Sequence, residues 1–224
     1  MQFTLEDISD AEIARRRGVY EPLTESVREL IDAAIRTEVP DEVIGEARRR
    51  IDEVVAMLRA EQIDGPYGVR YTPDFIGMPW GNAVIGVRNA IAPPLRTRFH
   101  DNEVSAEFTL GAAYEGPDHH VHGGVCAMIL DHVLGEGASL DNVPCYTGTI
   151  TVRYLRPTPL GTLTARASIV ARDGRKKIVR GTLSDADGVT VEAEGVFIAP
   201  KDWSGQMPRR ADKYVDESLV DKES

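Results

Sequence analysis

The stretch from His119 to Asp131, HHVHGGVCAMILD, limits what this chain can fold into more than any other. A histidine-rich turn passes through Gly123-Gly124 into a continuous apolar run that ends on a carboxylate. Small and straight-chain residues favour a helix, and a helix that is apolar on nearly every face is a buried one. Asp131 is therefore expected where a charged acid is costly unless it has partners, which is typical of a functional residue.

The composition is that of a soluble globular protein. The 224 residues, 42% apolar and 28% charged, predict one domain with a substantial extension. A net charge of −10 argues against nucleic acid as a partner. The sequence has no run long enough to span a membrane and no secretory core at its N-terminus. Cys126 lies in the apolar run and Cys145 is the other cysteine, so we expect no structural disulfide and a reducing, cytoplasmic location.

Residues 1–62 are predicted to form a helical extension. Pro40 and the acids after it mark the start of a second helix. Apolar residues recur at helical spacing as Val27, Leu30, Ile31, Ala34 and Ile35, and then as Ile44, Ala47, Ile51, Val54, Val55 and Leu58. The run from Arg48 to Arg50 lies mostly opposite the second set, which predicts a solvated face, with a partner-binding helix pair as the alternative.

The rest of the chain is predicted to be one helix among strands. Residues 63–95 are rich in glycine and proline and read as a long loop, of which residues 63–82 form the linker. Strand patterns occupy residues 96–100 and 103–112, before the apolar helix, and residues 145–155 after it.

Two turn signals follow, Asp173-Gly174 and Asp187-Gly188, which separate three consecutive antiparallel strands. A single apolar helix needs a sheet that curls around it, so the fold class is α+β, with the main domain at residues 83–199. Residues 200–224 are charged and are expected to be a loose tail.

The pattern of these motifs resembles a known family. His122-Gly123-Gly124 with Asp131 nine positions after the histidine is similar to the motif of hotdog-fold acyl-CoA thioesterases of the phenylacetate-degradation type. The strand at 146–157, with its Tyr-Leu-Arg-Pro ending, resembles the strand that follows the helix in that family. The resemblance covers residues 83–199. It implies a hotdog fold, hydrolysis of acyl-CoA thioesters without a separate cofactor, and a homodimer or a dimer of dimers.

Thioester hydrolysis needs an activated nucleophile and donors for the developing oxyanion. An acid among apolar residues can have its pKa raised, so Asp131 can serve as a general base; direct attack to give an anhydride is equally open. The helix start offers unsatisfied amides, and the glycines Gly123 and Gly124 let a substrate approach closely, with Gly124 as the oxyanion donor. By resemblance, Thr147 holds the lytic water or orients the acid. We expect His122 to orient the glycine turn or the substrate carbonyl, or to be purely structural.

The spacing of these groups predicts a composite site. Seven residues of helix separate Gly124 from Asp131, a rise of about 10 Å, which one thioester cannot easily bridge. If two copies of the helix lie antiparallel, the acid of one approaches the amide end of the other. The site is therefore expected at a dimer interface, as the family resemblance also implies.

The phosphates of coenzyme A need local attraction, because the chain as a whole is acidic. The densest basic group in the β region is Arg175-Lys176-Lys177, and Arg153 and Arg156 lie on the strand after the helix. We predict that some of these five residues meet the phosphates at the mouth of the site. The alternative is a charged hairpin that only keeps a sheet edge solvated.

Other chemistries are less well matched. Four histidines could suggest zinc, but no second ligand pair has the usual spacing, so no metal is predicted. The histidines are His119, His120, His122 and His132. A non-catalytic hotdog protein that binds acyl-CoA, or a partner through residues 1–62, is the second hypothesis. Hydratase chemistry is disfavoured because the acid lies in a helix led by His-Gly-Gly.

Overall fold

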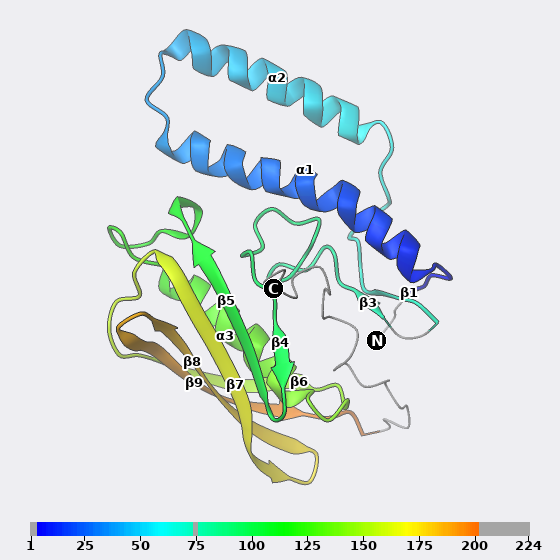
Figure 1. Ribbon diagram of the computed structural model, residues 1–224, viewed down its shortest axis with the longest axis vertical. Helices are drawn as coiled ribbons and strands as arrows, with labels where there is room; N and C mark the ends of the chain where they lie inside the picture. The colour runs from blue at the N-terminus through cyan, green and yellow to red at the C-terminus, as the bar shows by residue number, and fades with distance from the viewer. Residues whose placement is uncertain (1–3, 74–75, 202–224) are drawn as a thin grey trace, which may run out of the picture.

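The computed structural model describes residues 4–73 and 76–201. Its main body is a six-stranded antiparallel sheet in the order β4-β5-β7-β8-β9-β6, with helix α3 (Gly123–Ala138) packed against it (Figure 1). The strands are β4 (Arg98–His100), β5 (Glu103–Leu110), β6 (Tyr146–Tyr154), β7 (Gly161–Asp173), β8 (Lys176–Asp185) and β9 (Gly188–Ile198). The predicted α+β hotdog fold, in which a sheet wraps around a central helix, is confirmed.

The core lies between α3 and the face of the sheet that it covers. Alternate residues of β5 and β7 are buried, as the period of two requires. Glycines allow the helix and the strands to approach closely. A Cβ atom on Gly137 would lie 3.2 Å from Val179, and one on Gly181 would lie 3.1 Å from Leu134 and 2.6 Å from the carbonyl oxygen of Arg166. Gly137 and Gly181 therefore permit the close packing of α3 against the sheet.

One stripe of α3 is not covered, which differs from the expectation of a helix buried on every side. The residues along it are exposed or half-buried: Gly124, Ala127, Met128, Asp131 and Gly135. The sheet ends beside this stripe at β6, an edge strand whose residues are mostly exposed. Tyr146 and Tyr154 at the two ends of β6 are 50% and 52% exposed. This stripe of α3 is therefore uncovered because the sheet of the same protomer ends at β6.

The extension contains the two predicted helices, α1 (Asp10–Arg36) and α2 (Asp41–Arg59). The side chain of Ser9 caps α1 by accepting a hydrogen bond from the backbone amide of Glu12. Figure 1 shows α1 lying across one end of the main body and α2 beyond it, farther from the sheet. None of the described helices is long and apolar enough to cross a membrane.

A small three-stranded sheet was not predicted. Strand β1 (Thr4–Leu5) pairs in parallel with β2 (Arg70–Tyr71), which pairs antiparallel with β3 (Gly77–Met78). The first described residues therefore hold the segment that was read as a linker. Two-residue strands are too short to leave a periodic pattern in the sequence. The tail predicted at 200–224 lies, from residue 202 onward, outside the described residues.

Candidate active site

The turn that leads into α3 is held by its own backbone. Glu115 bridges to Val121, and the amide of Gly116 donates to the carbonyl of His120 at 2.9 Å. A Cβ atom on Gly116 would lie 2.6 Å from the Cα atom of His122, so only glycine fits at this crossing. The turn therefore delivers His122 to the N-cap of α3.

His122 acts on the predicted oxyanion donor directly. Its Nδ1 atom accepts a hydrogen bond from the backbone amide of Gly124 at 3.0 Å. A neutral ring that accepts at Nδ1 carries its proton on Nε2. His122 thus contacts the glycine turn through this hydrogen bond, and the roles expected for it stay predictions. A substrate oxygen would have to compete with this ring for the Gly124 amide.

Tyr154 supports the same turn from β6 and was not anticipated as a site residue. Its hydroxyl donates to the carbonyl of Gly123 at 2.8 Å. A Cβ atom on Gly123 would lie 3.4 Å from the Tyr154 ring, so the glycine lets this ring pack against the start of the helix. Burial raises the pKa of Tyr154, which keeps its hydroxyl a donor. The signal in the sequence was the tyrosine that opens the Tyr-Leu-Arg-Pro ending of the strand.

Asp131 and Thr147 meet although they come from different elements. The hydroxyl of Thr147, on β6, donates to Oδ1 of Asp131, on α3, at 3.0 Å. A β-bulge between Thr147 and Thr149 interrupts the pairing of β6 with β9 here. Asp131 is half-buried and lies on the uncovered stripe of α3, two turns from Gly124. The carboxylate is thus held in place and reachable from outside the protomer.

Three of the five basic residues predicted to bind phosphate, Arg156, Arg175 and Lys177, have protein partners. Arg156 makes two hydrogen bonds to the carboxylate of Asp185, one of them at 2.7 Å, and a third to the carbonyl of Gly188 at 2.9 Å. These contacts tie the end of β6 to the β8–β9 turn, and the hydrogen bond from Arg156 lowers the pKa of Asp185 to about 2. Arg175 donates to the carbonyl of Ala199 at 2.8 Å.

Lys177 is buried, with 6% of its surface exposed. Its Nζ atom donates to the carbonyl of Ala138 at 2.8 Å and pairs with Asp141 at 2.5 Å, so it caps the C-terminus of α3. Lys177 therefore has a structural contact that its sequence position did not reveal.

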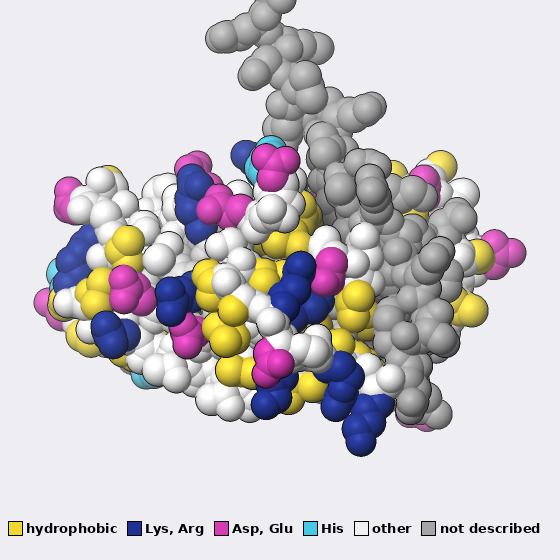
Figure 2. Space-filling view, turned by 90° about the horizontal axis from the view of Figure 1, so that it is seen from below, with side chains coloured by type: hydrophobic (Ala, Val, Ile, Leu, Met, Phe, Trp, Pro, Cys, Tyr) yellow, Lys and Arg dark blue, Asp and Glu magenta, His cyan; other side chains and the backbone are white. Residues whose placement is uncertain are grey.

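The basic residues do not form one patch. Lys177 and Asp185, the residue that Arg156 binds, are eight residues apart on β8, about 26 Å. Within one protomer, the structure does not bring the Arg175–Lys177 hairpin and Arg156 together. Figure 2 shows the end of the molecule that is lowest in Figure 1, where the β7–β8 hairpin lies. On this face, Lys and Arg side chains stand beside a band of hydrophobic ones.

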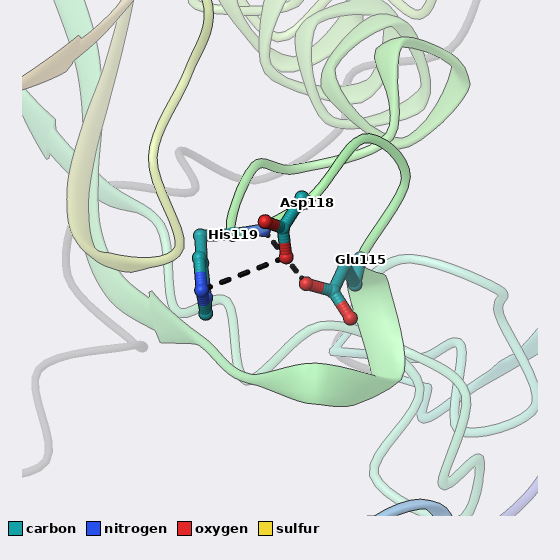
Figure 3. Close-up of side chains that lie close together, drawn as sticks. All are labelled: Glu115, Asp118 and His119. Carbon is teal, nitrogen blue, oxygen red and sulfur yellow. Dashed lines mark hydrogen bonds and ion pairs between the residues drawn. The ribbon is translucent and has the colours of Figure 1, made fainter.

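A group of acids with a histidine lies in the turn before α3. Ligand atoms of Glu115, Asp118 and His119 are all within 4.8 Å of one another, and the three residues are exposed (Figure 3). The amide of His119, whose φ is +59°, donates to a carboxylate oxygen of Glu115 at 2.8 Å. The group therefore closes the turn. His132, another of the histidines considered for zinc, lies instead on α3, where its Nε2 atom is 3.3 Å from Oε1 of Glu136.

A cavity of about 160 Å³ lies between α1 and the linker, away from Asp131. Its lining is arginine and aromatic: Arg15, Arg16, Val19, Tyr20, Tyr67, Arg70, Trp80 and Arg88. Arg16 and Arg70 pair with Glu6, and the Arg88 guanidinium stacks 3.8 Å from the centre of the Tyr20 ring. The Arg70–Glu6 pair joins the extension to the linker, and the Arg88–Tyr20 contact joins it to the main domain. We therefore do not assign the cavity to the substrate.

Comparison with known proteins places this geometry in a family. The family model described as the thioesterase superfamily matches residues 118–192. A crystal structure of a thioesterase superfamily protein is 31% identical, with a TM-score of 0.71; the match covers 80% of this chain and 90% of that one. The chain belongs to the thioesterase superfamily. This membership supports thioester hydrolysis as its general class of reaction.

Two further structures match this chain over about half of its length. A phenylacetic acid degradation-related protein from Ralstonia eutropha JMP134 is 23% identical, with a TM-score of 0.44, over 47% of this chain and 85% of that one. A Bacillus halodurans protein crystallised with CoA is 22% identical, with a TM-score of 0.45, over 50% of this chain and 77% of that one. No curated protein matched the sequence.

Proposed function

We propose that this protein hydrolyses acyl-CoA thioesters to the free acid and CoA at a site built from two protomers. The observation that carries the proposal is the placement of Asp131. Its carboxylate is oriented by the Thr147 hydroxyl at 3.0 Å and lies on the same uncovered stripe of α3 as Gly124. Such a stripe offers an acid and a backbone donor to a substrate that enters between two molecules.

The chemistry can follow two routes with the same residues. As a general base, Asp131 takes a proton from water, and the hydroxide forms a bond to the thioester carbon. The carbon–sulfur bond then breaks, and Asp131 returns the proton to the departing CoA thiolate. As a nucleophile, Asp131 itself attacks that carbon, CoA leaves, and water then cleaves the resulting anhydride. In both routes the Gly124 amide exchanges its hydrogen bond to His122 for one to the developing oxyanion.

The distance between these groups supports the proposed dimer. Gly124 and Asp131 remain two helical turns apart, about 10 Å of rise, on one α3. An antiparallel partner helix would bring the acid of one protomer to the amide of the other. The β7–β8 hairpin, which lies beside the C-terminus of α3, would then be nearest the α3 N-terminus of the other protomer. That arrangement would put Arg175 and Lys176 in reach of the CoA phosphates, a contact we propose for them.

The test is release of free thiol from a panel of acyl-CoA esters by wild type, Asp131→Asn and the matched exposed control Asp187→Asn. We expect Asp131→Asn to lose at least about 100-fold in kcat, because it can neither accept a proton nor attack. Binding of a non-hydrolysable CoA thioether should change little, and Asp187→Asn should behave as wild type. An Asp131→Asn variant that keeps a tenth of wild-type turnover would refute the assignment. Tight thioether binding by a wild type without turnover would favour the non-catalytic alternative.

The proposal that two protomers share the site is tested separately, by measuring activity as a function of protein concentration. Specific activity should fall as the protein is diluted through the concentration at which sedimentation shows that the dimer dissociates. A monomer with full activity at the assay concentration would exclude a site shared between protomers.

A further inference from the structure

Helix α2 leaves an entire apolar face uncovered. No residue of α2 is buried, although its apolar residues follow the 3-4 spacing of a packed helix. Ile51, Val54 and Leu58 are 37%, 47% and 50% exposed. The apolar face of α2, defined here as Ile44, Ala47, Ile51, Val54, Val55 and Leu58, spans about 100° of the helix. A stripe of that width is typical of a helix in a bundle rather than of one on a free surface.

Helix α1 carries a second uncovered apolar stripe. One of its faces contacts the main body, where Thr24 is buried and Arg28 donates to the carbonyl of Asn89. The neighbouring face does not: Leu23, Val27 and Leu30 are 38%, 37% and 41% exposed. The helical hairpin, residues 10–59, therefore presents apolar stripes on both of its helices. Exposed apolar surface of this extent on a soluble protein marks an interaction site.

The charges on the hairpin argue against a charged partner. Helix α2 has four arginines and five acids, and α1 has five arginines and six acids, so each has a net charge of −1. The arginines of α2 pair within the helix, as Arg49 and Arg50 do with Glu46 and Arg48 does with Asp52. A helix that binds nucleic acid or an anionic lipid surface needs an excess of unpaired basic residues on its polar face. A nearly neutral copy of the same hairpin, in contrast, meets little repulsion.

We infer that the hairpin is an assembly surface whose occupant is the hairpin of a second copy of this chain. The two α2 helices lie antiparallel with their apolar faces together, and the α1 stripes complete a four-helix bundle. An isologous contact of this kind is closed, so by itself it joins two chains and no more. This interface is separate from the uncovered stripe of α3 and does not depend on the proposed reaction.

Cysteine cross-linking of the full-length chain tests this arrangement. Ile51 lies next to the middle of α2, so in an antiparallel pair it is nearest its own symmetry mate. Ile51→Cys is compared with Ala56→Cys, which is also exposed but lies on the opposite face of the helix. Both are made in a Cys145→Ser background, because Cys126 is buried and Cys145 is not. The probe is a short bismaleimide, and covalent dimers are read on a denaturing gel.

We expect Ile51→Cys to give covalent dimers in high yield and Ala56→Cys to give at least about tenfold fewer, because only the first faces the second copy. No dimer from Ile51→Cys, or equal yields from both, would overturn the inference. Slow labelling of Ile51→Cys without dimers would also overturn it, since the face would then be covered by the same chain. Ile51→Glu should keep the wild-type kcat on acyl-CoA, so failure here is distinguishable from failure of the proposed function.

Discussion

Thr147→Val isolates the one hydrogen bond that orients the proposed catalytic carboxylate. Valine keeps the shape and the strand preference of threonine but removes the hydroxyl that donates to Asp131 at 3.0 Å. A hydrogen bond to a charged group contributes about 1.5–3 kcal/mol, which would correspond to roughly a 10- to 100-fold loss in kcat if all of it held the carboxylate in its reactive rotamer. Thr147 is exposed, so water can replace part of the bond and we expect the lower end, about tenfold.

The assay is steady-state thiol release with a saturating acyl-CoA, with two matched variants beside Thr147→Val. Thr147→Ser keeps the hydroxyl and should recover most of the kcat. Thr149→Val removes an exposed hydroxyl from the same strand on the other side of the bulge, and it should behave as wild type. If Thr147→Val keeps kcat within twofold of wild type, or if Thr149→Val is equally damaging, the hydroxyl does not orient the acid.

Three further predictions concern stability and pH. Lys177→Met should lower the free energy of unfolding by about 2–3 kcal/mol in urea titrations, because it removes the buried donor at the C-terminus of α3 and leaves Asp141 with Arg172 alone. Lys176→Met, at the exposed neighbouring position, should change it by less than about 0.5 kcal/mol. Gly181→Ala should cost about 2–3 kcal/mol by the same measurement, since its Cβ would lie 2.6 Å from a backbone oxygen. The pKa of Asp185 is lowered from 3.8 to about 2, so the stability that its pairing with Arg156 adds is present above pH 4 and is lost as the pH falls toward 2. In Arg156→Met, the melting temperature should therefore change less with pH over that range than it does in wild type. The same pH profile in both proteins would count against the pair.

The central helix and the strands of the main sheet could be predicted because each carries a long, regular pattern. The apolar run after Gly124 marked α3, and the Asp-Gly turns marked the hairpins, where Gly174 and Gly188 have φ values of +56° and +119°. The contact between Asp131 and Thr147 was expected from the family resemblance alone. Spacing along the chain could not have shown it, because it joins two elements across a β-bulge.

What the sequence could not reveal depends on contacts between distant segments. Lys177 reads as one of three basic residues after a turn, yet it alone of the three points beneath the end of α3. Side chains alternate between the two faces of β8, and Lys177 falls on the face that α3 covers. A lysine can be buried there only because the carbonyl of Ala138 at the C-terminus of α3 and the carboxylate of Asp141 accept its hydrogen bonds. Likewise, β1 and β2 pair over a separation of 66 residues, through only two positions each. Such pairings follow from the fold and leave no local signal.

The same reasoning explains why the predicted burial of α3 was met only in part and why α2 exposes its apolar face. The residue patterns of α2 and α3 are those of helices covered on an apolar face, yet α2 has no buried residue and α3 keeps a stripe uncovered at the β6 edge. The apolar pattern of a helix indicates which of its faces is buried in the assembled protein, whether the same chain or another copy covers that face. The two uncovered faces belong to different elements and lie on different parts of the molecule, with α1 between α2 and the sheet (Figure 1). One contact between two copies would not readily cover both, so the pattern favours two separate self-contacts, one that completes the site around Asp131 and one that closes the helical hairpin.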